Sequence, residues 1–376
     1  MFDLKLILNK IYHNDIASID FSSEYCIDYE KMPIITHIDN TGGSNIFDGY
    51  PVWRNLISLH KHNYFACNLY DKIYIWNIDA KKYERVINCY SEITALLCLP
   101  NGQLLSAHTD KTVKIWQPET GEYLGDFGKF SSFVTSMKLL YDKLATLTDD
   151  GVIQYWDIKT KMPLSQTLDI NANSINMLNA DSNQKIIAAN GSYIYYQGLN
   201  ETIKQKLLSD NLNITASLFD PYDLFICGDD HGSLYIFDLA YIKCKYSLKV
   251  SQRTVNSLTI LPDGNIIACF DDNIMCVFHP EEGRILQIIK TNSLIRETIV
   301  LSDGRIIGAA CNGDFYIWQF PIRALNGTDT FLITENLDKN TSVKSLNYTN
   351  VILDQYDISW IDELHGKRPD MTIEVG

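Results

Sequence analysis

The sequence predicts an all-β protein built from seven repeats of four strands each. The first observation is a fixed period: an aromatic residue ends an apolar run every 40 or 41 residues along the chain. The second is the turn chemistry, because short apolar runs are separated by Asn-Gly, Asp-Gly or similar turns. The aromatic residues are Trp76, Trp116, Trp156, Tyr196, Phe237, Phe278 and Trp318.

One repeat shows the order of its elements clearly. The apolar run 254–261 leads into the turn Pro262-Asp263-Gly264, and the run 265–270 follows. The turn at 271–273 then leads into a third run ending at Phe278, and the variable run 284–289 is the fourth. Acidic pairs resembling catalytic dyads stand at 149–150, 229–230 and 271–272. Their recurrence at one repeat position predicts turn residues instead.

A four-stranded sheet of about forty residues cannot bury two apolar faces by itself. Stacking such sheets radially buries both faces and leaves only short edges exposed. The predicted architecture is therefore a β-propeller. The recurring aromatic side chain of the third strand is expected to lie between successive blades as a structural anchor.

The period, the Asp-Gly turn and the dipeptide Trp156-Asp157 resemble the WD40-repeat family over roughly residues 50–320. Phe237-Asp238 is the dipeptide most similar to Trp-Asp in the other repeats, and the Gly-His dipeptide typical of the family is absent. The residues that match the family's turn aspartate are Asp110, Asp150 and Asp272, and no histidine precedes them in the expected connection. We therefore expect packing, rather than the family's Asp–His hydrogen bonds, to hold the blades.

The number of blades is open between seven and eight. A degenerate repeat at 15–49 precedes the regular series at 50–320, with Thr36 standing 40 residues before Trp76. Eight blades would begin there, with 4–8 or 330–334 completing the last sheet; seven would begin at the Trp76 blade, with both termini added. Eight is favoured. Residues 1–320 are thus assigned to the propeller and 321–376 to a strand-containing extension that closes the ring or is appended to it.

Composition and charge restrict the function. The chain has 376 residues, 46% of them hydrophobic, with a mean hydropathy of -0.10 and a net charge of -14. This charge disfavours binding to nucleic acid and anionic membranes, and no run is long enough to span a bilayer. Nine cysteines are scattered without a Cys-x-x-Cys pair, which predicts buried free thiols in the cytoplasm and no structural zinc.

The Asn-, Ile- and Tyr-rich composition is typical of an AT-rich genome. It suggests two sources, a protist or a bacterium that delivers effector proteins into host cells. In the second case the protein would act in the host cytosol, on a host protein.

No motif for catalysis or cofactor binding is found in the sequence. His60 and His62 have a spacing that a metal could use, but neither a cysteine nor a carboxylate lies nearby, so a solvated turn is the better interpretation. His231 is expected to hydrogen-bond within its own turn. We therefore expect neither a cofactor nor enzymatic activity.

A ligand of a propeller usually meets the mouth of the central channel, where the innermost strands begin. The residue after the first apolar position of these strands is usually Thr or Asn, but Arg54 and Arg296 occupy it in the Trp76 and Trp318 blades. With Arg253 nearby, these arginines could bind a phosphate, an acidic peptide or a carboxylate. The alternative is a local pair with Asp48 or Glu297.

Trp53 and Phe133 stand at loop positions on the same face. Their side chains either contact a partner protein or cover the ends of the blades. The resemblance implies a non-catalytic scaffold that presents a propeller face to protein partners. The alternative is a reader of an anionic ligand or a phosphorylated or acidic peptide at the channel mouth, although the Phe-Arg-Arg-Gly motif of phosphoinositide-binding propellers is absent. A hydrolase or lyase on the propeller is the third hypothesis.

Overall fold

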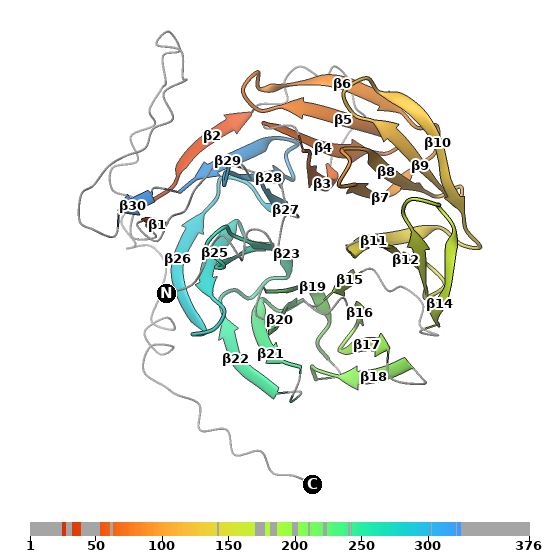
Figure 1. The fold of residues 1–376 in the computed structure, drawn as a ribbon. Helices are drawn as coiled ribbons and strands as arrows, with labels where there is room; N and C mark the ends of the chain where they lie inside the picture. Colours follow the sequence, from red (N-terminus) through yellow and green to blue (C-terminus); the bar gives the residue numbers. More distant parts are fainter. Residues whose placement is uncertain are drawn as a thin grey trace. The chain divides into compact units, whose positions relative to one another are not determined.

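The described part of the chain is made of β-strands. The computed structural model describes residues 25–27, 32–38, 53–60, 63–140, 143–169, 177–180, 186–197, 202–209, 211–220, 224–239, 241, 243–301, 303–320 and 322–324. The chain divides into the units Met1–Phe331 and Leu332–Gly376, and every described residue lies in the first. Its strands form seven four-stranded antiparallel sheets and one short two-stranded sheet (Figure 1).

Six sheets, or blades, are each formed by four consecutive strands, the first of which is innermost (Figure 1). Blade 1 contains β3 (Arg54–Ser58), β4 (Tyr64–Leu69), β5 (Lys72–Asn77) and β6 (Lys82–Asn88); blade 2 contains β7 (Ile93–Cys98), β8 (Leu104–His108), β9 (Thr112–Gln117) and β10 (Glu122–Lys129); blade 3 contains β11 (Val134–Leu140), β12 (Lys143–Thr148), β13 (Val152–Asp157) and β14 (Pro163–Asp169). Blade 4 contains β15 (Met177–Ala180), β16 (Ile186–Asn190), β17 (Tyr193–Gln197) and β18 (Thr202–Lys206); blade 5 contains β19 (Ile214–Phe219), β20 (Leu224–Asp229), β21 (Ser233–Asp238) and β22 (Lys243–Lys249); blade 6 contains β23 (Val255–Ile260), β24 (Ile266–Phe270), β25 (Ile274–His279) and β26 (Arg284–Lys290).

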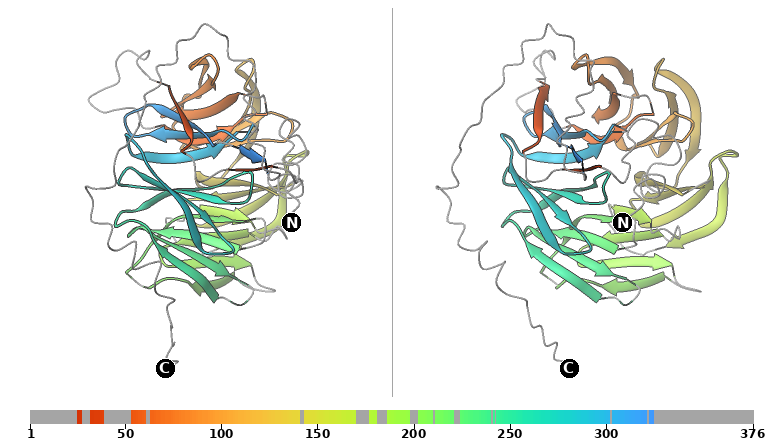
Figure 2. Two further views of the ribbon diagram at one scale, coloured as in Figure 1. Left: turned by 90° about the vertical axis from the view of Figure 1, so that its left-hand side faces the viewer. Right: turned by 60° about the vertical axis from the view of Figure 1, so that its left-hand side comes forward.

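Blade 7 joins the two ends of the propeller. Its three inner strands are β27 (Ile295–Val300), β28 (Ile306–Ala310) and β29 (Phe315–Gln319), and its outer strand is β2 (Ile34–Ile38) (Figure 2). Strand β2 runs antiparallel to β29, with Ile35 opposite Trp318. A second antiparallel pair joins β1 (Tyr25–Ile27) to β30 (Ile322–Ala324). Such pairing between early and late strands hides the edge that an open ring would leave.

The expectation of eight blades is therefore wrong. The segment around Thr36 does not begin a blade of its own; it completes blade 7 as a single strand. Each innermost strand contacts the innermost strands of its two neighbours, and β27 contacts β3, so the ring closes after seven blades. The candidate closing segments 4–8 and 330–334 lie outside the described residues.

The core is divided among the seams between blades. Seven clusters of buried apolar side chains are found among the described residues, and each is shared by two neighbouring blades. The second strands, such as β8 and β24, are buried along their whole length because blades cover both of their faces. The described anchors Trp76, Trp116, Trp156, Phe237, Phe278 and Trp318 are buried, each against the preceding blade. For Tyr196 the structure describes only its backbone, on β17.

Packing is not the only interaction that holds the blades, contrary to the expectation from sequence. In blade 2, the indole N–H of Trp116 donates to Ser106 Oγ at 2.7 Å, and Ser106 Oγ lies 2.7 Å from His108 Nε2. Because the carbonyl of Ser91 can only accept, the Nδ1 of buried His108 donates to it at 3.1 Å. The histidine comes from the end of the second strand instead of the preceding connection, which is why the family spacing did not reveal it.

In blades 2, 3, 6 and 7 the second-strand residue two positions beyond the one paired with the anchor matches the anchor in polarity or size. Trp156 donates its indole N–H to Thr146 Oγ1 at 3.0 Å. The side chain of Phe278 has no N–H group, and Ala268 stands at the corresponding position. Trp318 has Gly308 there; a Cβ on this glycine would stand 2.5 Å from the indole ring, and among the described residues the Trp318 Nε1 has no hydrogen-bond partner. Blades 2 and 3 therefore combine indole with hydroxyl, blade 6 combines phenyl with methyl, and blade 7 has space for the indole instead of a hydrogen bond.

Candidate partner-binding face

The innermost strands begin with a shared irregularity at one end of the channel. In β7, β11, β19, β23 and β27 the pairing register skips the second residue of the strand, as in a β-bulge. The side chain of that residue is then free to reach the neighbouring blade. Thr215 Oγ1 donates to the Val255 carbonyl at 2.7 Å, and Asn256 Nδ2 donates to the Ile295 carbonyl at 3.3 Å. Thr and Asn at these positions thus tie successive blades together.

The two arginines interrupt this ring of ties. Arg296 occupies the skipped position of β27, Arg54 begins β3, and these strands contact each other where blades 7 and 1 meet. Both side chains are exposed, and the Nε of Arg296 donates to Cys311 Sγ at 3.0 Å. Within the described ranges neither guanidinium forms an ion pair. The structure therefore brings two cationic groups to the same end of neighbouring innermost strands.

The proposed alternative, a pair between an arginine and Glu297, is not what the structure shows. The Glu297 carboxylate accepts hydrogen bonds from the backbone N–H groups of Asn55 and Leu56 on β3. Burial raises the pKa of Glu297 to about 7, against the lowering effect of these two hydrogen bonds. Glu297 therefore fastens blade 7 to blade 1 and does not neutralise the arginines. The other candidate partner, Asp48, lies outside the described residues.

Two exposed tyrosines lie at the same end of blade 1 as Arg54, where blade 1 meets blade 2, and no sequence motif indicated them. Tyr70 is 67% exposed in the turn between β4 and β5, and Tyr90 is 89% exposed in the connection between β6 and β7. The two segments are joined because the N–H of Ile93 donates to the Tyr70 carbonyl at 3.0 Å. Both tyrosines have a left-handed backbone, with φ of 51° and 63°, which is uncommon for a bulky residue. Tyr70 could have been noticed, because other repeats place Gly or Asn in this turn.

Trp53 and Phe133 have different environments. Trp53 is only 3% exposed: its indole N–H donates to the Gly313 carbonyl at 2.7 Å, and its ring stacks on Phe315. It therefore joins blade 1 to blade 7 and is not available as a surface contact. Phe133 is half-buried in the connection that leads into β11.

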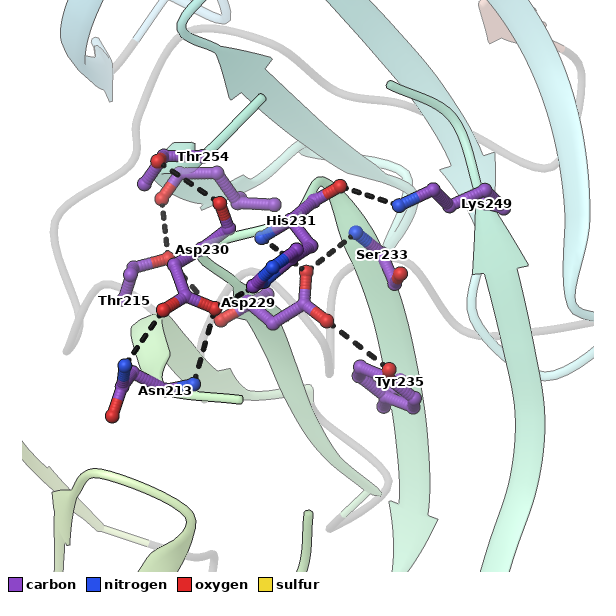
Figure 3. A network of polar contacts seen from close by, with 11 residues as sticks. Asn213, Thr215, Asp229, Asp230, His231, Ser233, Tyr235, Lys249 and Thr254 are labelled. Atoms are coloured by element: carbon purple, nitrogen blue, oxygen red, sulfur yellow. Dashed lines mark hydrogen bonds and ion pairs between the residues drawn. The ribbon is translucent and has the colours of Figure 1, made fainter. Parts of the chain in front are cut away.

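A polar network joins blades 5 and 6 (Figure 3), and Arg253 directly precedes one of its members, Thr254, in the sequence. The buried carboxylate of Asp229 accepts from the N–H groups of His231 and Ser233 and from the hydroxyl of Tyr235. These contacts make Asp229 a turn residue, in agreement with the interpretation of the acidic pairs. Arg253 itself is exposed and forms no ion pair within the described part of the chain.

Asp230 connects this network to the neighbouring segments. Its carboxylate accepts from Asn213 and lies 2.8 Å from the Nδ1 of His231, so this histidine interacts within its own turn as predicted (Figure 3). The Asp230 carbonyl accepts from the Thr254 hydroxyl. Gly232, with φ of 81°, is required here because a Cβ would stand 2.5 Å from the Arg253 carbonyl oxygen. Arg253, Arg296 and Arg54 thus belong to three successive blades, 6, 7 and 1.

The remaining candidate groups do not form a site. His60 Nε2 lies 2.8 Å from the Leu99 carbonyl, and His62 is outside the described residues. Over the ranges that the structure describes, no group of three or more His, Cys, Asp or Glu side chains is placed to hold a metal ion. The same ranges contain no helix long and apolar enough to cross a membrane.

Comparisons with known proteins agree with this architecture. The family model described as "WD domain, G-beta repeat" matches residues 81–117 and 242–279. Each matched segment spans the outer strand of one blade and the three inner strands of the next, so the sequence repeat is offset from the blade by one strand. A crystal structure of a mitotic checkpoint complex contains a similar chain, with a TM-score of 0.61 and 14% identity over 82% of this chain and 97% of that one.

Two curated proteins match shorter stretches. The ribosome biogenesis protein WDR12 homolog of Dictyostelium discoideum is 30% identical over 102 residues, which are 25% of this chain and 22% of that protein. Telomerase protein component 1 of Rattus norvegicus is 25% identical over 87 residues, which are 22% of this chain and 3% of that protein. This chain therefore matches less than a quarter of the length of either protein.

Proposed function

We propose that this chain, a seven-bladed β-propeller that contains WD40 repeats, is a non-catalytic scaffold that binds a partner protein through the channel mouth at blades 7, 1 and 2. The observation that supports this face best is that exposed Arg54, Arg296, Tyr70 and Tyr90 lie at the same end of the successive blades 7, 1 and 2. Tyrosine and arginine are enriched among the residues that dominate interface energies. Two tyrosines held in a left-handed backbone are more simply explained by recognition than by folding.

The surroundings of this face favour a scaffold over a catalyst. The Thr and Asn side chains at the mouth, which could have formed a polar site, bond to carbonyls of neighbouring blades. The rigid seam formed by Trp53 and Glu297 also fixes the arginines relative to the tyrosines before a partner arrives, which lowers the entropic cost of binding. One curated relative is named for ribosome biogenesis and the other as a component of telomerase, which is in keeping with a protein that works together with partners.

The test is affinity capture from eukaryotic cell lysate by the full chain and by charge-reversed variants. The Arg54→Glu/Arg296→Glu variant, checked for folding by circular dichroism, should lose a partner that the wild type binds saturably. The Tyr70→Ser/Tyr90→Ser variant should bind the same partner at least about tenfold more weakly, because two hot-spot side chains are removed.

The matched control for the arginine variant is Arg284→Glu/Lys82→Glu, which reverses the same number of charges on the outer strands of blades 6 and 1. It should leave capture unchanged. An identical set of partners for the wild type and the Arg54/Arg296 variant would refute the proposed face and favour the side surface or the C-terminal segment.

We also propose a cytoplasmic location, in the host cytosol if the chain is a delivered effector. The support is the state of the cysteines: the eight that the structure describes are free thiols. Desolvation raises the pKa of the buried thiols Cys67, Cys227 and Cys269, so they remain protonated and unreactive. Localisation by fluorescence microscopy of the tagged protein tests this.

A further inference from the structure

The innermost strands carry an unusual set of charges. The chain as a whole has 46 acidic and 32 basic residues. The seven innermost strands, β3, β7, β11, β15, β19, β23 and β27, contain Arg54, Lys138 and Arg296 but one acidic residue, Glu297. An acidic protein thus has a predominantly cationic lining around its axis.

Lys138 extends this positive charge into the channel. It lies on β11, three residues beyond the position that corresponds to Arg296, which is about 10 Å further along the strand. The side chain is exposed to water, yet desolvation by the protein around it lowers the pKa of its ammonium group. Lys138 is thus a third exposed cation on an innermost strand. In the described part of the chain Lys138 has no hydrogen-bond or ion-pair partner.

The single acidic residue does not cancel these charges. The Glu297 carboxylate accepts from the backbone of β3, as described above, and among the described residues the guanidinium groups of Arg54 and Arg296 have no anionic partner. An anion that meets these exposed cations would gain charge-assisted hydrogen bonds from all three of them. The lining of the channel is therefore complementary to an anion with more than one negative charge.

We propose that the channel binds a phosphate-bearing anion, with Arg54 and Arg296 holding one phosphoryl group at the mouth and Lys138 a second anionic group deeper inside. Guanidinium forks match the oxygen pairs of a phosphoryl group, and an ammonium group serves as a point charge. The site goes beyond the proposed partner-binding face and does not depend on it. Two sources share this chemistry: a small soluble polyphosphate and the phosphorylated side chain of a protein.

The experiment is isothermal titration calorimetry of the full chain with inorganic tripolyphosphate, and with a phosphoserine peptide and its unphosphorylated twin. The wild type should bind a phosphate-bearing probe, and Arg54→Gln/Arg296→Gln should weaken binding by at least about tenfold. Lys138→Gln should weaken it several-fold, and the control Arg284→Gln/Lys82→Gln should not change it. The tighter of the two probes then identifies the source.

Two results would overturn the proposal: no binding of either phosphate-bearing probe by the folded wild type, or equal affinity in all variants. Lys138→Gln also separates this proposal from the previous one. If tripolyphosphate is the tighter probe, Lys138→Gln should weaken binding of the anion and leave capture of the partner protein unchanged; if the phosphoserine peptide is tighter, the same substitution should weaken both.

Discussion

Glu297 gives the sharpest quantitative prediction. Its pKa is raised from 4.5 to about 7 because the carboxyl group is enclosed at the seam of blades 7 and 1. In the unfolded chain the group ionises near 4.5, whereas in the folded chain it keeps its proton until about pH 7. The folded state therefore binds more protons between these values, and stability must fall as the pH rises through this window and level off above it.

The structure sets the size of this effect. At about 1.4 kcal/mol per pKa unit, the rise from 4.5 to about 7 corresponds to about 3 kcal/mol of unfolding free energy lost by neutral pH. Glu297→Gln removes the ionisation but keeps the shape and one acceptor oxygen for the N–H groups of Asn55 and Leu56. Relative to the wild type, the variant should gain about 2.5 kcal/mol of unfolding free energy between about pH 5 and about pH 8, because at pH 5 the carboxyl group of the unfolded chain is already mostly ionised.

The assay is urea unfolding followed by circular dichroism at both pH values, with reversibility checked. The amide group can change the unfolding free energy by an amount that does not depend on pH. This amount cancels, because only the change of the difference between wild type and Glu297→Gln with pH is compared. Glu122→Gln, which removes an exposed carboxylate on the outer strand of blade 2, is the control. A difference between wild type and Glu297→Gln that is the same at both pH values would refute the reasoning.

Three further predictions concern the blades. Thr146→Ala should cost about 1–3 kcal/mol of unfolding free energy, because it leaves the buried indole N–H of Trp156 without an acceptor; thermal unfolding measures this, and an unchanged midpoint would contradict it. Gly232→Ala should destabilise the protein more than Gly102→Ala, because both have a left-handed backbone but only a Cβ at 232 would meet carbonyl oxygens; equal losses in urea would count against the close contact. Deleting residues 1–38 removes β2 and uncovers β29, so light scattering should show self-association, and a monomeric, equally stable product would argue against the closure.

Local patterns predicted most of the fold. The period of 40 residues, the turn residues and the aromatic anchors are all read within one repeat, and they indicate four strands and radial stacking. The blade count failed because the segment around Thr36 resembles part of a repeat, whereas its partner, β29, lies some 280 residues away. Strand patterns show that a segment is a strand but not which sheet it joins.

The candidate site was predictable only in part. The position of Arg54 and Arg296 at the start of innermost strands follows from aligning the repeats, and a ring of seven makes their strands neighbours. The orientation of Glu297 toward the backbone of β3 depends on a contact across the seam, so no local pattern indicates it. Trp53 was ambiguous for the same reason, because its acceptor at Gly313 is 260 residues distant.

The central claim is that the mouth of the channel at blades 7, 1 and 2 binds a protein partner, and hydroxyl-radical footprinting of the full chain with and without the captured partner tests it most directly. If the partner binds at the mouth, it should protect Tyr70, Tyr90 and the starts of β3 and β27 from labelling. Protection confined to exposed residues of the opposite end, such as Met162 and Tyr241 in turns between third and fourth strands, would contradict it.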